Sequence, residues 1–237
     1  DPTMIKFLMD YVKNHQDEFN FSDPRNIPID DEKVYKLLNG TEAIGLTKED
    51  LRGSEIASFG IPEMGTKFVR DMLRDSRPNN FADAVKISGL SHGTDVWLNN
   101  AKTLVNGSNR LYGKVPFKDV IGCRDDIMVS LIGWGMKEST AFEISEFIRK
   151  GKAESNKIKW ETYKTIMSSH KIPDWYIWSC GQIKYMFPKA HATAYVLMAM
   201  RIAWFKLYKP ILFYSAYFSI RATHFDVYAF QGGEYEI

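Results

Sequence analysis

The stretch Pro188-Lys-Ala-His-Ala-Thr-Ala-Tyr-Val-Leu-Met-Ala-Met-Arg-Ile-Ala-Trp-Phe-Lys-Leu-Tyr-Lys209 decides the fold, because it predicts one long helix. A proline suits the first turn of a helix, where its missing N–H needs no partner, and Pro210 would stop the helix after Lys209. The apolar part of this stretch, residues 192–205, is interrupted by Arg201 and is too short to span a bilayer. We therefore expect a buried helix and no membrane partner.

Helix signals also occur upstream of this stretch. Thr66 can cap a helix whose apolar stripe is made of Phe68, Val69, Met72 and Leu73. Asn80 can cap a second helix over residues 81–90. Further helices are expected from Thr94 or Asp95 to Asn106-Gly107, from Asp125 to Trp134, and from the capping-box pattern Thr140–Glu143, with Ile144, Phe147 and Ile148 on one face, to Lys150-Gly151.

These signals leave little room for a sheet, since only residues 58–61 resemble a strand. No repeat, low-complexity run or long linker occurs. We expect an all-α fold class with a small N-terminal lobe (1–63), a main helical body (64–222) and a C-terminal tail (223–237).

The composition is that of a packed globular protein, with 45% hydrophobic and 14% aromatic residues among 237. The two cysteines, Cys123 and Cys180, fit neither a metal-binding spacing nor a disulfide framework, which favours a cytoplasmic location. The chain opens on Asp1-Pro2-Thr3 without a signal peptide, so we expect a fragment of a longer protein.

Charge is distributed unevenly along the chain. Residues 1–63 carry 13 acidic and 7 basic side chains, and the remainder carries 16 acidic and 24 basic ones. The steepest excess lies in 149–171, where seven lysines and arginines face two glutamates. This excess fits a polyanionic partner, and it fits a solvated helix pair equally well.

Conventional catalytic motifs are missing: there is no GxGxxG, Walker A, HExxH or CxxC pattern. The adjacent pairs Asp30-Asp31 and Asp125-Asp126 diverge on any regular element, so a surface or capping role is expected for both. We therefore assign no catalytic residue and no metal ligand.

The start of the long helix is the best candidate for a phosphate site. Lys189 and His191 lie in or near its first turn, where unpaired backbone N–H groups favour an anion. Tyr195 follows one turn later on the same face and could lie beside a base or sugar. The alternative is a tightly packed structural helix with a satisfied histidine.

A second candidate is the joint Ser88-Gly-Leu-Ser-His-Gly-Thr-Asp-Val-Trp97. Its glycines and short polar side chains could bring Ser88, Ser91 and His92 against a ligand, although a plain interhelical turn needs no function. Arg124 could clamp a phosphate, or it could pair with the neighbouring aspartates.

Five blocks, in this order, resemble the PolC type of bacterial DNA polymerase III alpha subunits. They are residues 40–47, 60–70, 87–98, 120–129 and 183–199. The shorter pattern Phe-Pro-Lys-Ala-His-Ala-Thr-Ala-Tyr is also similar to the alpha subunit of the other bacterial replicase branch. Residues 106–118 and 152–170 depart from the pattern, and the tail from Gln231 onward matches nothing.

The resemblance implies the helical fingers domain of a bacterial C-family DNA polymerase, a replicative DNA-directed nucleotidyltransferase. In that family two Mg²⁺ ions are held by aspartates of the palm, which is missing from this sequence, so we expect this fragment to bind no metal and to be inactive alone. Implied partners are primer-template DNA, the incoming dNTP, the palm and other domains, and, through missing domains, the sliding clamp and replisome.

The resemblance also assigns residues to roles. Lys189, His191, Arg124 and Lys184 would hold the triphosphate, and Tyr195 would lie near the sugar or base. Ser88 and Phe187 match family positions that line the base-pair pocket, where guanine-mimicking inhibitors bind. From the joint 88–97 we expect Ser91 and His92 to line it as well. Independently of the resemblance, the excess of lysine over acid in 149–171 predicts that Lys150, Lys152, Lys157 and Lys159 hold the DNA backbone. The rival hypothesis is a stand-alone helical DNA-binding or scaffold protein that uses the basic segment 149–171.

Overall fold

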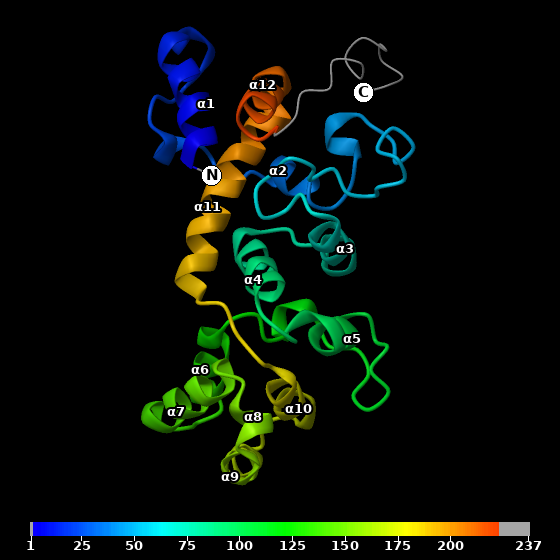
Figure 1. The fold of residues 1–237 in the computed structure, drawn as a ribbon, viewed down its shortest axis with the longest axis vertical. Helices are drawn as coiled ribbons and strands as arrows, with labels where there is room; N and C mark the ends of the chain where they lie inside the picture. Colours follow the sequence, from blue (N-terminus) through cyan, green and yellow to red (C-terminus); the bar gives the residue numbers. More distant parts are fainter. Residues whose placement is uncertain (1, 223–237) are drawn as a thin grey trace.

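A single long helix, α11 (Lys189–Tyr208), runs along the axis of the molecule in the computed structural model, which describes residues 2–222 (Figure 1). The other α-helices of these residues are α1 (Pro2–Asn14), α2 (Glu32–Lys36), α3 (Lys67–Ser76), α4 (Phe81–His92), α5 (Lys102–Val105), α6 (Arg124–Gly133), α7 (Glu138–Arg149), α8 (Lys152–Ser155), α9 (Lys157–Ser169), α10 (Asp174–Gln182) and α12 (Pro210–Ile220). Short helical turns are η1 (Gln16–Glu18), η2 (Pro24–Asn26), η3 (Glu42–Ile44), η4 (Trp97–Ala101) and η5 (Phe117–Asp119).

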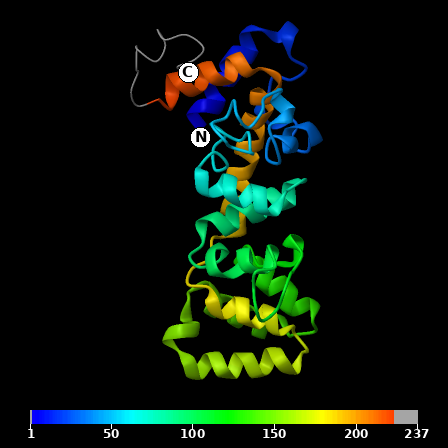
Figure 2. The same ribbon diagram turned by 90° about the vertical axis from the view of Figure 1, so that its right-hand side faces the viewer.

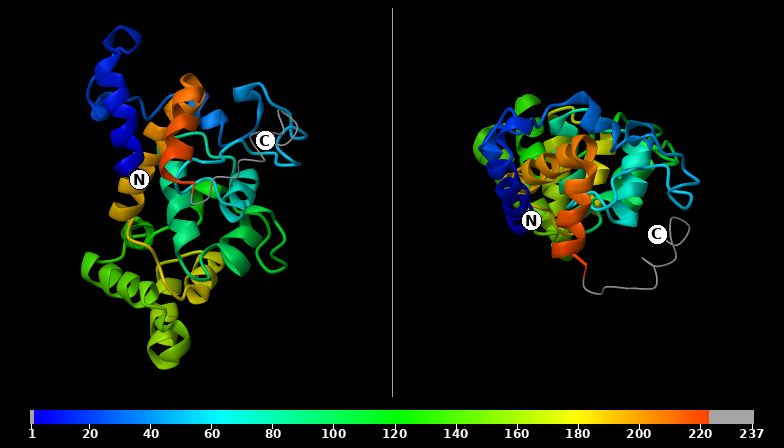
Figure 3. Two further views of the ribbon diagram at one scale, coloured as in Figure 1. Left: turned by 45° about the horizontal axis from the view of Figure 1, so that its top comes forward. Right: turned by 90° about the horizontal axis from the view of Figure 1, so that it is seen from above.

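The helices form an elongated arrangement. Helices α1 and α12 lie side by side at one end (Figure 3), and α8 and α9 lie at the opposite end (Figure 2). Between them α4 packs along α11. No helix within residues 2–222 is both long and apolar enough to cross a membrane.

The expected all-α fold class is confirmed, since residues 2–222 contain no strand and only an isolated bridge between Thr94 and Tyr185. The strand expected at 58–61 is wrong. The Ile61 N–H donates to the Ser58 carbonyl (3.1 Å), and the Ser58 hydroxyl donates to the Met64 carbonyl (2.6 Å). These local bonds close a turn, so the backbone of Ser58 pairs within its own loop.

Two helix starts follow their capping signals. The Thr66 hydroxyl accepts from the Val69 N–H (3.3 Å), and the Asn80 side chain accepts from the Asp83 N–H (2.9 Å). Val69 lies in the core as expected, whereas Phe68 is 40% exposed. The predicted apolar stripe is therefore wrong for Phe68 and confirmed for Val69, Met72 and Leu73.

The helix expected between Thr94 and Asn106 is broken. Leu98, Asn99 and Asn100 leave helical geometry, and Asn99 has φ +59°. The buried Asn100 amide donates to the carbonyls of Asp95 (3.0 Å) and Ser179 (3.2 Å), and Ser179 donates back to it (2.6 Å). This side-chain network replaces helical hydrogen bonds, and α5 begins only at Lys102.

Helices α6 and α7 begin earlier than their signals indicated. Asp126 accepts from the N–H groups of Gly122 (3.0 Å) and Cys123 (3.1 Å), so α6 starts at Arg124. Helix α7 starts at Glu138, and the expected capping box at Thr140–Glu143 therefore lies inside the helix. The capping role expected of the aspartate pairs is confirmed for Asp126 and for Asp31, which caps α2.

The core has two parts. One joins α2, the segment 56–64 and α3 to helices α4–α11, and the second joins Met4 and Leu8 of α1 to Phe205 of α11 and Phe213 of α12. Residues before 63 thus share a core with residues after 200. The lobe boundary at residue 63 stays a prediction, and the tail 223–237 lies outside the described residues.

Candidate functional site

The end of α4 is tied to the segment that leads into α11. The Thr94 N–H donates to the Tyr185 carbonyl (2.9 Å), and the Lys184 N–H donates to the Thr94 carbonyl (3.1 Å). A Cβ at Gly93 would lie 2.9 Å from that Tyr185 carbonyl oxygen, so this close approach requires glycine. The two candidate segments of the sequence, 88–97 and 184–195, therefore lie next to each other.

Four of the candidate residues form one ring cluster. The His92 and Phe187 rings stack with centroids 4.6 Å apart and 21° between their planes. Tyr195 stacks on Phe187 at 6.2 Å, and His191 meets the edge of Phe187 at 5.9 Å. Because Tyr195 is 42% exposed, the cluster presents an aromatic face to solvent. We call His92, Phe187, His191 and Tyr195 the ring cluster.

His92 is held in place on both ring nitrogens. Its Nε2 lies 2.8 Å from a carboxylate oxygen of Glu63, and its Nδ1 lies 2.8 Å from the Ser88 carbonyl. The hydrogen bond with Glu63 raises the pKa of His92, and the same bond lowers the pKa of Glu63. Sequence reasoning missed Glu63, which lies in the block 60–70 and which no local pattern marks as a partner of His92.

The two serines lie behind the ring cluster. Ser88 is 1% exposed, and its hydroxyl has no hydrogen-bond partner among the described residues. Ser91 donates to the Ser88 carbonyl (3.0 Å) and lies 3.0 Å from His92 Nδ1. Ser88 is thus a buried polar group beneath the cluster, where an unpaired hydroxyl costs about 1–3 kcal/mol.

The first turn of α11 is occupied by carboxylates of α6. Lys189 Nζ lies 3.1 Å from Asp126, and the Lys189 N–H donates to Asp125 (3.4 Å). Burial lowers the pKa of Lys189, but the charge and hydrogen bond of Asp126 outweigh this effect, so its pKa is raised. Lys189 is therefore a cation held at a helix N-terminus, where an anion already lies.

Arg124 shares one of these carboxylates, Asp125, as one of its alternatives predicted. It lies 3.3 Å from Asp125 and 3.1 Å from Glu146. Glu146 also binds Arg149 (2.9 Å) and Lys150 (3.4 Å), and the hydrogen bond of Arg149 is the largest cause that lowers the pKa of Glu146 to about 2. Three cations therefore surround one carboxylate, which leaves positive charge in excess.

Sequence reasoning also missed two lysines beside Lys189. Two cavities of about 440 and 410 Å³ share Lys86, Lys118, Asp126 and Lys189 in their walls. Lys86 donates to the Val120 carbonyl (2.8 Å), and burial lowers its pKa. Residues 81–90 were expected to form a helix, but the pattern did not indicate which face Lys86 would occupy.

Lys184 lies apart from the other candidate cations. Its ammonium is 3.6 Å from Asp95 and 3.5 Å from Glu154. Its backbone passes so close to Gly151 that a Cβ there would overlap the Lys184 carbonyl. Within residues 2–222 no carboxylate that pairs with Lys184 also pairs with Lys189 or Arg124.

The four lysines assigned to the DNA backbone divide into two groups. Lys150 pairs with Glu146, whereas Lys152, Lys157 and Lys159 are exposed on α8 and α9 and have no carboxylate within 4.0 Å among the described residues. Lys159 lies 5.4 Å above the Tyr163 ring. These helices form the end of the molecule farthest from α12 (Figure 2).

The carboxylates near Lys189 do not fit a magnesium centre. Their oxygens are engaged by the α6 cap, Arg124 and Lys189. Across residues 2–222 no group of three or more His, Cys, Asp or Glu side chains could hold a metal ion. We therefore derive no metal-dependent step from these residues.

Comparison with known proteins identifies the relatives of this chain. Residues 1–171 match the model of the family described as bacterial DNA polymerase III alpha subunit finger domain. The chain is 53% identical to the DNA polymerase III PolC-type of Oceanobacillus iheyensis and 50% identical to that of Bacillus subtilis, over 96% of its length in both. It is 49% identical to that of Lacticaseibacillus paracasei over 99% of its length. The chain spans only 14–15% of these relatives. It belongs to the family of bacterial DNA polymerase III alpha subunit finger domains.

Proposed function

We propose that this chain is the fingers part of a replicative DNA-directed DNA polymerase, where it binds the incoming dNTP and packs against the nascent base pair. The observation that carries the proposal is the junction of α4 and α11, which brings the ring cluster beside the cationic first turn of α11. A nucleotide needs both surfaces, because its phosphates seek cations and its base seeks aromatic faces.

The phosphate end of the site would use Lys189 and Arg124, with His191 one helical turn before Tyr195. Asp125 now accepts from the Lys189 N–H and lies beside Arg124, so one carboxylate occupies the place where a phosphate oxygen would be bound. We propose that the triphosphate displaces Asp125. Lys86 and Lys118 would add charge from the adjoining cavities.

The base end would use the exposed face of Tyr195 and the stacked pair of Phe187 and His92. Stacking on such rings stabilises a base by about 1–3 kcal/mol without reading its identity. Ser88 and Ser91 would support this face from behind. Selection of the correct base would then rest on the fit of the whole base pair.

The remaining assignments concern the complete polymerase. We propose that Mg²⁺ is held by aspartates of a palm outside this chain, and that the chain alone has no polymerase activity. Primer-template DNA would contact the lysines of α8 and α9, and other domains would carry the contacts to the sliding clamp and replisome. The relatives are polymerases of which this chain spans 14–15%, which favours this proposal over a stand-alone DNA-binding protein.

Kinetics of Lys189→Ala in the complete polymerase test the proposal. Loss of a charge-assisted contact of about 1.5–3 kcal/mol lowers kcat/KM for the nucleotide by about 10- to 150-fold. Lys137→Ala, an exposed lysine before α7, is the control for charge. Near-normal kcat/KM for folded Lys189→Ala, together with a lower melting temperature, would assign Lys189 a purely structural role.

A further inference from the structure

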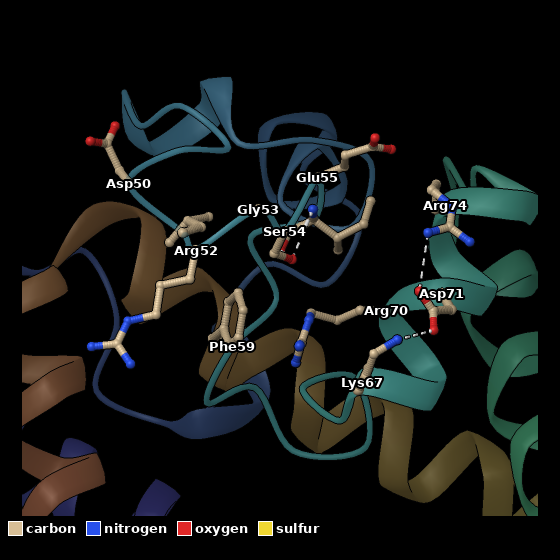
Figure 4. A pocket seen from close by; sticks show the side chains of 12 residues that line it. Asp50, Arg52, Gly53, Ser54, Glu55, Phe59, Lys67, Arg70, Asp71 and Arg74 are labelled. Atoms are coloured by element: carbon tan, nitrogen blue, oxygen red, sulfur yellow. Dashed lines mark hydrogen bonds and ion pairs between the residues drawn. The ribbon is translucent and has the colours of Figure 1, made fainter.

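A cavity of about 500 Å³ lies between the loop 50–56 and helix α3 (Figure 4). No residue of the ring cluster lines it. Four cations and three carboxylates contribute to its walls: Arg52, Lys67, Arg70, Arg74, Asp50, Glu55 and Asp71.

The carboxylates of this cavity pair with Lys67 and Arg74 but not with Arg52 or Arg70. Asp71 binds Lys67 (2.9 Å) and Arg74 (3.1 Å). Asp50 and Glu55 lie at the outer rim, well separated from Arg70 in Figure 4. Within the described residues neither Arg52 nor Arg70 has a carboxylate within 4.0 Å.

Arg70 is held with its guanidinium over the Phe59 ring. Its Cζ lies 3.8 Å from the ring centroid, and one of its N–H groups donates to the Gly65 carbonyl. No hydrogen bond within residues 2–222 involves its other N–H groups. A fixed guanidinium with donors to spare suits the paired oxygens of a phosphate.

A second cation lies behind the Phe59 loop. Lys206 of α11 is 2% exposed and donates to the carbonyls of Ala57 and Phe59, at 2.6 Å each. No carboxylate pairs with it within the described residues. Burial, followed by the charge of Arg70, lowers the pKa of Lys206 to about 8, and burial lowers the pKa of Arg70. Positive charge is therefore under-compensated here, and an anion would relieve it.

We propose that Arg70 and Arg52 bind the phosphodiester backbone of a nucleic-acid strand. Phe59 is already covered by Arg70, so the cavity offers cations without a free aromatic face for a base. This favours backbone contact over capture of a free nucleotide. The choice of a strand rests in part on the proposed function, because the same loop carries Glu63, which holds His92 of the ring cluster.

Binding of a labelled oligothymidylate to the 237-residue chain, followed by fluorescence anisotropy over a range of salt concentrations, tests this site. Arg52→Glu should weaken binding and reduce the slope of log K against log salt by about 0.7, the value for one lost contact to a single strand. Lys48→Glu is the matched control, since Lys48 is exposed in the same region and lies outside the cavity wall.

Arg70→Gln should weaken binding further, and circular dichroism melts establish whether it folds. Arg52 is exposed and has no carboxylate partner within residues 2–222, so its variant should fold whether or not Arg70→Gln folds. Equal slopes for Arg52→Glu and Lys48→Glu would overturn the proposal. The proposal would also be overturned if Arg52→Glu weakened the binding of dATP and left the binding of the oligothymidylate unchanged. Lys189→Ala should lower nucleotide kcat/KM in the complete polymerase and should leave the salt slope of oligothymidylate binding by the 237-residue chain unchanged. The two measurements therefore test the two proposals separately.

Discussion

Nε2 of His92 lies 2.8 Å from Oε2 of Glu63, and this ion pair joins the last residue of α4 to the loop before α3. Glu63 has a positive φ of +66°, a conformation that costs a non-glycine residue free energy. The pair holds the His92 ring parallel to Phe187. The loop that carries Glu63 is therefore coupled to the orientation of the ring cluster.

The stability of the chain should depend on pH through this pair. The pKa of His92 is raised above 6.5, so its contribution is complete below pH 6.5 and is lost as pH rises through the folded value. The pKa of Glu63 is lowered below 4.5, so its contribution is present above pH 4.5 and is lost as pH falls. The pair should stabilise the fold most between about pH 4.5 and 6.5.

Urea unfolding of wild type and Glu63→Gln at several pH values measures this dependence. The difference in unfolding free energy should reach about 1 kcal/mol in that window, since solvent screens a partly exposed pair, and should shrink on both sides. Glu55→Gln, an exposed glutamate of the preceding loop, is the control. A difference that stays constant from pH 4 to 9 would contradict the assignment of the pair.

The local signals of the sequence were sufficient to predict where several helices begin. Thr66, Asn80 and Pro188 act on backbone groups within three or four residues, so their effect can be predicted without the fold. Pro210 was interpreted as an end, but a proline also suits the first turn of a helix, and α12 begins there. Pro210 therefore follows the end of α11 and also begins α12.

Contacts between distant residues could not be predicted in the same way. The Asn100–Ser179 network, 79 residues apart in the chain, breaks a helix that local propensity favours. Lys189 and Asp126, 63 residues apart, meet only because α6 lies against the start of α11. Sequence reasoning named Lys189 and Arg124 as cations but could not show that Asp125 contacts both, through the backbone N–H of Lys189 and the guanidinium of Arg124.

Replacing Asp125 by Asn should strengthen nucleotide binding. Asp125 accepts from the Lys189 N–H and lies 3.3 Å from Arg124, so in the proposed site it would compete with a triphosphate for both. Removing its charge should tighten the Kd of a dNTP for the complete polymerase by about fivefold, or about 1 kcal/mol. Asp119→Asn, which removes an equal charge from the adjoining cavity wall, should have less effect. Weaker binding by folded Asp125→Asn would show that Asp125 assists the site.

Phe187→Ala should weaken base-mimicking inhibitors more than natural nucleotides. Phe187 stacks on both His92 and Tyr195, which also stack on each other. In the proposed base pocket, a flat inhibitor without phosphates would depend on this apolar wall for most of its affinity. A natural nucleotide keeps its phosphate contacts at α11. Inhibition constants and nucleotide KM for Phe187→Ala and Phe187→Leu in the complete polymerase decide the matter. Equal losses for both ligands would place Phe187 outside the base pocket.

The lysines of α8 and α9 should bind DNA backbone without base specificity. Lys152, Lys157 and Lys159 are exposed and unpaired within the described residues, whereas Lys150 already pairs with Glu146 at 3.4 Å. Neutralising all four to Gln in the complete polymerase should reduce the slope of log K for duplex DNA against log salt by about 0.9 for each true contact. Restoring Lys150 alone should recover the least. Neutralising Lys13, Lys33, Lys36 and Lys48, four exposed lysines near the other end, changes net charge equally and serves as the control. If the slope of the fourfold Gln variant of α8 and α9 equals that of wild type, these lysines do not contact DNA and are only solvated.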